Sequence, residues 1–211
     1  MSMSTRAPVA SLPAFARAAL ILVLCPALCA APSAASAGAA AASKCDGVSF
    51  PGQIQAHGET LTLNGLGLRK ATIFSIKVYV GALYVPHPTS DAAAILTSQQ
   101  PVEVELRFVF RVSAGQLRSA WQEGFEKSAP DDLPRLQSRI AQLNGWMTGV
   151  KSGQRMTFLR VPGVGIQYAL DGAVQGTIPG DDFAKAFLAI WLGASPPSPE
   201  LRAGLLGGPC T

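Results

Sequence analysis

An arginine in the first half of the chain stands among large apolar residues, where a charged side chain needs a partner. Leu68 directly precedes Arg69, and Phe74 follows it closely. A guanidinium is permanently charged and presents a planar fork of donors that matches a carboxylate at two points. Its burial without an anion is costly. Arg69 is therefore a candidate receptor for an acidic head group. The alternatives are an ion pair with an internal carboxylate, or a side chain that points into water.

The other side chains that could do chemistry have simpler interpretations. His57 and His87 lie far apart, each beside a turn-forming residue, so we expect both to be exposed in loops. Asp181 and Asp182 could form an acid pair, but two carboxylates at the start of a helix also suit its positive end. The sequence shows no Ser-His-Asp order, Gly-rich phosphate loop or carboxylate cluster with metal-ligand spacing. We therefore predict neither a metal site nor a cofactor.

The first forty residues are not expected to belong to the fold. Arg6 and Arg17 are the only charges before Lys44, and an apolar run over 18–28 follows Arg17. A small-residue cleavage site at 35–37 completes the pattern of a secretory signal peptide. The apolar run is shorter than the roughly 20 residues that span a bilayer. We predict an exported protein, periplasmic or secreted, without a transmembrane segment after cleavage.

The predicted organisation is a signal peptide over 1–37, a flexible segment over 38–44 and one folded domain over 45–211. The leader holds two of the 17 basic side chains and none of the 13 acidic ones, so the mature chain has a net charge of about +2. This balance, with no run of basic residues, argues against a nucleic-acid partner and is consistent with a monomer.

Two of the four cysteines fall in the predicted leader, which leaves Cys45 and Cys210 at the two ends of the mature chain. In an oxidising compartment a lone pair is most simply a disulfide that ties the termini together. Two free thiols or a metal site are the alternatives. A zinc site is poorly supported because no histidine lies near either cysteine.

The clearest strand is predicted over 102–111, where apolar and polar residues alternate. Its apolar face comprises Val102, Val104, Leu106, Phe108 and Phe110. Further strand-like segments cover 61–63, 68–85, 156–161 and 166–170. Asn64-Gly65 is interpreted as a hairpin-type break, and Asp171-Gly172 as a tight turn. Successive strands joined by short turns indicate antiparallel pairing.

Helical periodicity occurs between and after these segments. A capping box formed by Ser113 and Gln116 opens one helix, and Ser198 is a candidate N-cap for a short final one. Other helices are predicted over 91–96, over 133–143 and from 181 to about 192. Trp121, Phe125, Phe187 and Trp191 recur at helical spacing and are expected in the core, some of them lining the floor of a cleft. The predicted class is α+β, with helices layered on one face of an antiparallel sheet.

Three groups of segments together resemble the bacterial, secreted branch of the chalcone isomerase-like family. The resemblance extends over 46–208, with the segments in the expected order. The segments that carry it are 63–69 with 77–84, 108–111 with the helix through 121–125, and 178–183 with 190–193. The resemblance implies an open-faced β-sandwich in which helices pack on a large antiparallel sheet.

The family includes two kinds of function. Plant chalcone isomerases close a flavanone ring, and an arginine stabilises the developing anion. Fatty-acid-binding relatives use the equivalent arginine with a tyrosine to hold a carboxylate. The resemblance places Arg69 and Tyr79 in these roles, and Tyr84 matches a second family aromatic more loosely. The tyrosine and the asparagine that the isomerases place around the substrate have no counterpart in this sequence, which offers Trp121 and Gln122 in the middle of the chain.

Arg69 and Tyr79 can share a ligand only if the chain reverses between them. On one regular strand they would lie roughly 33 Å apart, although on the same face. The family implies a bend near Phe74-Ser75, where the sequence offers neither glycine nor proline.

We therefore expect a non-catalytic periplasmic protein that binds a fatty acid or similar amphipathic carboxylate in an apolar cleft. Its head-group residues would be Arg69 and Tyr79, with Tyr84 and Trp121 as further ligand contacts. One alternative is an intramolecular lyase acting on chalcone-like phenols, with Arg69 as its catalytic residue. The other is an envelope interaction domain with a vestigial cleft.

Overall fold

The computed structural model describes residues 41–71 and 75–211, which belong to a compact unit over Ala37–Thr211. The predicted signal peptide lies outside the described residues. The predicted flexible segment over 38–44 is described only from residue 41. Its last two residues, Ser43 and Lys44, are not irregular, because they pair in strand β1 (Ser43–Cys45) with β2 (Val48–Phe50).

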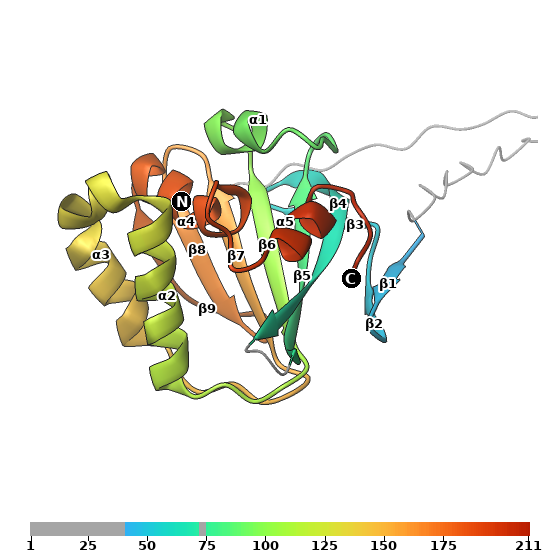
Figure 1. Cartoon of the computed structure of the whole chain (residues 1–211). Coiled ribbons are helices and arrows are strands. Elements are labelled where there is room, and N and C mark those ends of the chain that lie inside the picture. Colours follow the sequence, from blue (N-terminus) through green and yellow to red (C-terminus); the bar gives the residue numbers. More distant parts are fainter. Residues whose placement is uncertain (1–40, 72–74) are drawn as a thin grey trace, which may run out of the picture. The chain divides into compact units, whose positions relative to one another are not determined.

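Seven antiparallel strands form the main sheet in the order β3-β4-β5-β6-β7-β8-β9, so each strand pairs with its neighbours in sequence (Figure 1). The strands are β3 (Gln53–Ala56), β4 (Glu59–Ala71), β5 (Ile76–Val85), β6 (Val102–Phe108), β7 (Arg155–Val161), β8 (Gly165–Leu170) and β9 (Ala173–Pro179). Longer connections that contain helices join β5 to β6 and β6 to β7, whereas β7–β8 and β8–β9 are joined by short turns. One of them, at Asp171-Gly172, has positive φ at both residues, as the sequence predicted.

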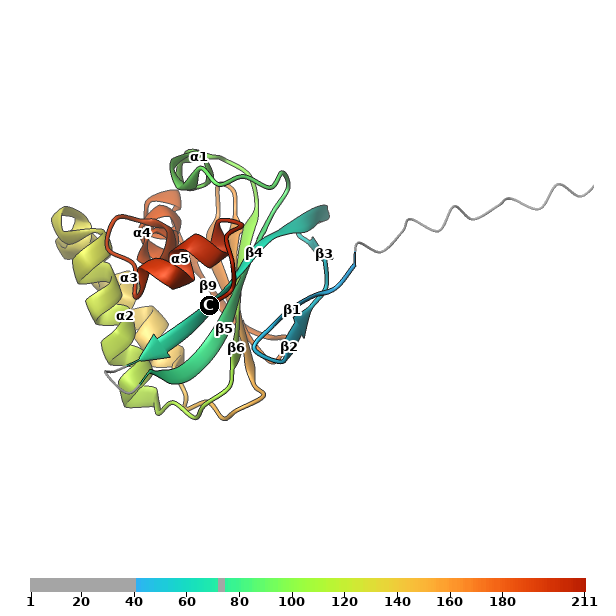
Figure 2. The ribbon, with the colours of Figure 1, turned by 45° about the vertical axis from the view of Figure 1, so that its right-hand side comes forward.

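Helices gather on one face of the sheet (Figures 1 and 2). They are α1 (Ala92–Thr97), α2 (Ala114–Ser128), α3 (Leu133–Trp146), α4 (Asp181–Leu192) and α5 (Pro199–Leu205). The larger core lies between them and the sheet and includes Phe125 and Phe187, both fully buried. The predicted α+β architecture is confirmed. Within the described chain, no helix combines the length and apolar character needed to cross a membrane.

Local signals explain where the helices start. Ser113 and Gln116 form the predicted capping box of α2, and Ser198 caps α5. Asp181 and Asp182 begin α4, where Asp182 forms an ion pair with Arg139 at 2.7 Å.

The opposite face of the sheet has a second, smaller core beneath the β1-β2 ribbon (Figure 2). Phe50 of β2 and Tyr84 of β5 are fully buried in it. Cys45 at the end of β1 forms a disulfide with Cys210, with Cα atoms 6.0 Å apart. The predicted disulfide is therefore present, and it fastens the C-terminal segment to the ribbon.

The interpretation of Asn64-Gly65 as a hairpin break is wrong. Strand β4 continues through these residues with a register shift against β5. The Asn64 side chain is used in a tertiary contact: it donates to the Leu205 carbonyl at 2.8 Å and accepts from the Thr89 amide at 2.7 Å. Gly65 lies against α5, where an added Cβ would stand 2.1 Å from the Gly204 carbonyl oxygen. The pair therefore permits close helix packing on a bulged strand.

The two histidines are exposed and lie outside the helices and strands, His57 with φ 49°. Among residues 41–71 and 75–211, no group of three or more His, Cys, Asp or Glu side chains is arranged to hold a metal ion.

Candidate functional site

The hairpin of β4 and β5 brings Arg69 directly opposite Tyr79 in the sheet register. The required reversal therefore occurs between Ala71 and Ile76. The bend was predicted near Phe74-Ser75. Phe74 lies outside the described residues, and Ser75 has φ 52°. A register shift directly after Arg69 marks where the regular ladder ends. Arg69 and Tyr79, which would lie roughly 33 Å apart on one strand, therefore form a cross-strand pair.

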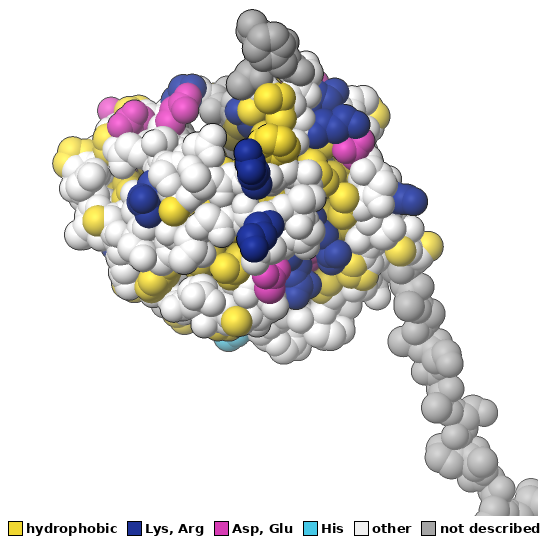
Figure 3. Space-filling model, turned by 90° about the horizontal axis from the view of Figure 1, so that it is seen from below, with side chains coloured by type: hydrophobic (Ala, Val, Ile, Leu, Met, Phe, Trp, Pro, Cys, Tyr) yellow, Lys and Arg dark blue, Asp and Glu magenta, His cyan; other side chains and the backbone are white. Residues whose placement is uncertain are grey.

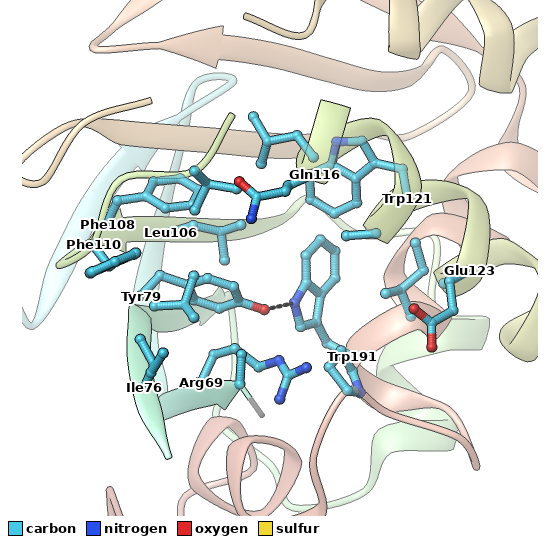
Figure 4. Close-up of a pocket in the computed structure, with 18 of the residues that line it drawn as sticks. Arg69, Ile76, Tyr79, Leu106, Phe108, Phe110, Gln116, Trp121, Glu123 and Trp191 are labelled. Carbon is cyan, nitrogen blue, oxygen red and sulfur yellow. Dashed lines mark hydrogen bonds between the residues drawn. The ribbon is translucent and has the colours of Figure 1, made fainter. Parts of the chain in front are cut away.

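Tyr79 is fixed by a hydrogen bond from the helical layer. The indole Nε1–H of Trp191 on α4 donates to its hydroxyl oxygen at 3.1 Å (Figure 4). Its ring meets Phe108 edge-on, with centroids 5.7 Å apart. Burial raises the pKa of Tyr79, an effect that the Trp191 hydrogen bond and the charge of Arg69 only partly offset. The phenol is therefore neutral, and its own proton remains available for donation to a ligand.

The Arg69 guanidinium has no carboxylate partner in the described chain. The residues outside that part, 1–40 and 72–74, contain no Asp or Glu. One guanidinium nitrogen donates to the backbone carbonyl of Lys70. The side chain is partly buried and lines a cavity. Glu123 also lines this cavity; its pKa is lowered mainly by its hydrogen bond from Lys127 and to a smaller extent by the charge of Arg69, with which it forms no ion pair. The internal ion pair considered as an alternative is absent from residues 41–71 and 75–211.

A cavity of about 380 Å³ lies between the sheet and helices α2 and α4, within the size range of small-ligand sites. Arg69, Tyr79 and Trp191 converge on one side of it (Figure 4). Its walls are mostly apolar. The apolar lining residues are Ala71, Ile76, Val78, Leu106, Phe108, Phe110, Val112, Leu117, Ala120, Trp121, Ile190, Trp191 and Pro197. The charged lining residues are Arg69, Arg111, Lys127 and Glu123, so cations outnumber the one carboxylate, and this charge beside a long apolar wall suits an amphipathic anion.

Trp121 contributes an apolar surface to this cavity. It lies on α2 with 5% of its surface exposed, and its Nε1–H donates to the Met147 sulfur at 3.0 Å. Its ring packs edge-on against Trp191 with centroids 5.8 Å apart. The indole donor is thereby occupied, so the part of Trp121 that lines the cavity offers apolar contact to a ligand.

A sequence model described as chalcone isomerase-like matches residues 42–207. The chain belongs to the chalcone isomerase-like family. A crystal structure of a fatty-acid binding protein from Arabidopsis thaliana resembles it with a TM-score of 0.61 and 18% sequence identity. The match covers 76% of this chain and 92% of the plant protein, and at this identity it shows a shared fold. No curated protein is significantly similar to the chain in sequence.

The fold expected for a chalcone isomerase-like protein is confirmed, but one expected ligand contact lies elsewhere. Tyr84 is not brought to the cavity. It stands five residues after Tyr79 on β5, and successive strand residues alternate between faces, so the two side chains point to opposite sides of the sheet. Tyr84 is fully buried in the smaller core and donates to the Pro51 carbonyl at 3.1 Å.

Trp191 is the site residue whose role the sequence did not reveal. Its spacing with Phe187 on α4 predicted a core position, and it is indeed fully buried. Its bond to Tyr79 joins residues 112 positions apart. The sequence offered one indication of this role: a buried Trp N–H usually has a hydrogen-bond partner, so Trp191 could be expected to donate to a polar side chain.

Proposed function

We propose that this chalcone isomerase-like protein binds a fatty acid or similar amphipathic carboxylate in its cleft and does not catalyse a reaction. The observation that carries this proposal is the partly buried Arg69, which faces the cavity without a carboxylate partner in the described residues. A bound carboxylate completes the site by accepting two guanidinium hydrogen bonds. The neutral Tyr79 hydroxyl supplies a third donor.

The rest of the cleft favours an aliphatic tail. Beyond the head-group end the ligand would meet Phe108, Leu117 and the ring of Trp121. Such walls gain free energy by removing hydrocarbon from water, at about 0.8 kcal/mol per buried CH₂. The structural similarity to a plant fatty-acid binding protein supports the same ligand class.

Two further observations favour binding over isomerisation. The positions at which chalcone isomerases were expected to offer mid-chain polar groups hold Trp121 and Gln122. The Trp121 donor is occupied by Met147. Gln122 donates to Glu126 at 2.9 Å and is not among the residues that line the cavity. Neither group is therefore positioned to assist ring closure. Incubation with a chalcone should give racemic flavanone at the background rate.

We further propose that the protein acts after export, in the periplasm or outside the cell, with residues 1–37 removed as a leader. The Cys45–Cys210 disulfide supports an oxidising compartment. Mass determination of the protein recovered from a periplasmic extract tests both the cleavage site and the location.

The ligand proposal is tested by thermal unfolding of delipidated protein with a medium-chain fatty acid. A ligand at about one hundred times its Kd stabilises a folded protein by about 2.7 kcal/mol. The Arg69→Ala variant should lose most of that gain. Arg135→Ala is the matched control, because Arg135 is exposed on α3 and does not line the cavity. An equal gain in Arg69→Ala and wild type would refute the assigned head-group site.

A further inference from the structure

Two exposed apolar side chains border the mouth of the cleft. Four large hydrophobic residues of the described chain are exposed, and two of them, Ile76 at 39% and Phe110 at 46%, line the cavity. Ile76 begins β5, and Phe110 follows the end of the adjacent strand β6, where its amide donates to the Val78 carbonyl at 3.2 Å. They therefore lie at the same end of the sheet. Two exposed apolar side chains that continue an apolar cavity onto the surface are a candidate contact for a partner.

Basic side chains lie on both faces of this end of the β4-β5 hairpin. Arg111, exposed and next to Phe110, lines the cavity. Lys70 is exposed at the end of β4, opposite Lys77 in the register, on the face of the hairpin turned away from the cavity-lining Arg69 and Ala71. Neither Arg111 nor Lys70 forms an ion pair with a carboxylate of residues 41–71 and 75–211, whereas Lys77 is paired with Asp46. Figure 3 views the molecule from below and shows hydrophobic side chains beside Lys and Arg side chains.

We propose that Ile76, Phe110, Lys70 and Arg111, together called the cleft rim, dock the protein on an anionic lipid bilayer with the cleft mouth facing the lipid. Apolar side chains at such a surface insert into the boundary between head groups and acyl chains, while cations beside them meet the lipid phosphates. The mature chain is nearly neutral overall, so the attraction comes from the local placement of these cations.

A lipid surface fits this rim better than an acidic protein because the rim continues into the apolar cavity. The apolar wall runs from Phe110 at the rim through Phe108 to Tyr79 and Trp191 at the head-group end. A docked rim would let a ligand pass between bilayer and cleft with little exposure of its tail to water. This consequence rests on the proposed fatty-acid binding, but docking itself does not.

Flotation of the purified protein with phosphatidylcholine vesicles, with and without phosphatidylglycerol, tests the docking. The wild type should bind the anionic vesicles and release them as salt rises. Lys70→Ala and Arg111→Ala should each weaken binding about fivefold. The double variant Ile76→Ser/Phe110→Ser should lose binding. Val164→Ser/Val174→Ser, which changes the two other exposed apolar residues, should retain it.

Equal binding to neutral and anionic vesicles, or equal loss in both serine double variants, would overturn the proposal. Should Ile76→Ser/Phe110→Ser fail to fold, Lys70→Ala/Arg111→Ala decides, since it alters only exposed charges. If a fatty acid stabilises the wild-type protein but the protein does not bind anionic vesicles, docking is refuted and the proposed ligand binding stands. Vesicle binding by a protein that no fatty acid stabilises would support docking and refute the proposed ligand.

Discussion

Removal of a single oxygen, in Tyr79→Phe, separates the structural and ligand-binding roles of the head-group site. The Tyr79 hydroxyl accepts the indole proton of the fully buried Trp191 at 3.1 Å. Its own proton is available to a ligand because burial raises its pKa. The phenylalanine ring keeps the contact with Phe108 and fills the same space. The variant therefore leaves one buried donor without its acceptor and deprives the ligand of one hydrogen bond.

These two losses have different magnitudes and different assays. An unsatisfied buried N–H costs about 1–3 kcal/mol, so the free energy of unfolding of ligand-free Tyr79→Phe should fall by that amount and its urea midpoint should be lower. A hydrogen bond to a charged group contributes about 1.5–3 kcal/mol, so the fatty-acid Kd should rise roughly 10- to 150-fold. Urea titration measures the first, and quenching of tryptophan fluorescence by the ligand measures the second.

Tyr168→Phe is the matched control for Tyr79→Phe. Tyr168 is also fully buried, but within the described part of the chain its hydroxyl has no hydrogen-bond partner, and it does not line the cavity. Loss of that hydroxyl removes an unsatisfied group and should leave stability unchanged or raised, with ligand affinity unaltered. If Tyr79→Phe behaves like this control in both assays, the role given to the Tyr79–Trp191 pair is wrong.

Three further predictions, each with its own comparison, concern the stability of the fold. Gly67→Ala should lower the free energy of unfolding by about 1–3 kcal/mol, because the added Cβ would lie 2.4 Å from the Leu201 carbonyl oxygen. Gly145→Ala, at a position in α3 with open space around the added Cβ, should instead raise the free energy of unfolding by up to about 1 kcal/mol. Equal changes for the two variants in urea titrations would contradict the close packing of Gly67 against α5. Reduction of the Cys45–Cys210 disulfide, which spans 165 positions, should cost about 5 kcal/mol in urea titrations on the chain-entropy model. The urea midpoint of the Cys45→Ala/Cys210→Ala variant should not change when reductant is added. A wild-type urea midpoint that is unchanged by reduction would refute the predicted loss. Burial and repulsion from Glu105 raise the pKa of Glu103 from 4.5 to about 7, so its contribution to stability is fully present below pH 4.5 and is lost as pH rises through about 7. Glu103→Gln should flatten that part of the stability–pH curve, whereas an unchanged slope would exclude the shift.

The features predicted well from sequence were those governed by nearby residues. The Ser113–Gln116 capping box and the alternation predicted over 102–111 depend on contacts within a few positions. The capping box is present, while the strand covers only Val102–Phe108 and leaves Phe110 exposed. The bend between Arg69 and Tyr79 came from the family resemblance, since no glycine or proline marked it. Tyr84 was assigned to the ligand although its odd separation from Tyr79 places it on the other face of the strand.

The predictions that failed or were missed depend on partners distant in sequence. Asn64-Gly65 has the composition of a turn, but the Leu205 carbonyl and the backbone of α5 determine its conformation. No local rule anticipates a helix more than 130 residues later. The same holds for Trp191, whose periodicity on α4 indicates burial without saying that its N–H meets Tyr79. Local chemistry identified the candidates, and tertiary contacts decided their roles.

The spacing Gly65-x-Gly67-x-Arg69 has a physical explanation in these contacts. Alternate residues of β4 face the helical layer, so the two glycines and the arginine share one side. The glycines allow the backbone of α5 to lie directly on the strand, with the Leu201 and Gly204 carbonyls where side chains would stand. Two residues further along, Arg69 is the first large side chain on that face, and it enters the cavity. Close packing by α5 therefore covers this face of β4 as far as Gly67, and the lining of the cavity begins on the same face with Arg69.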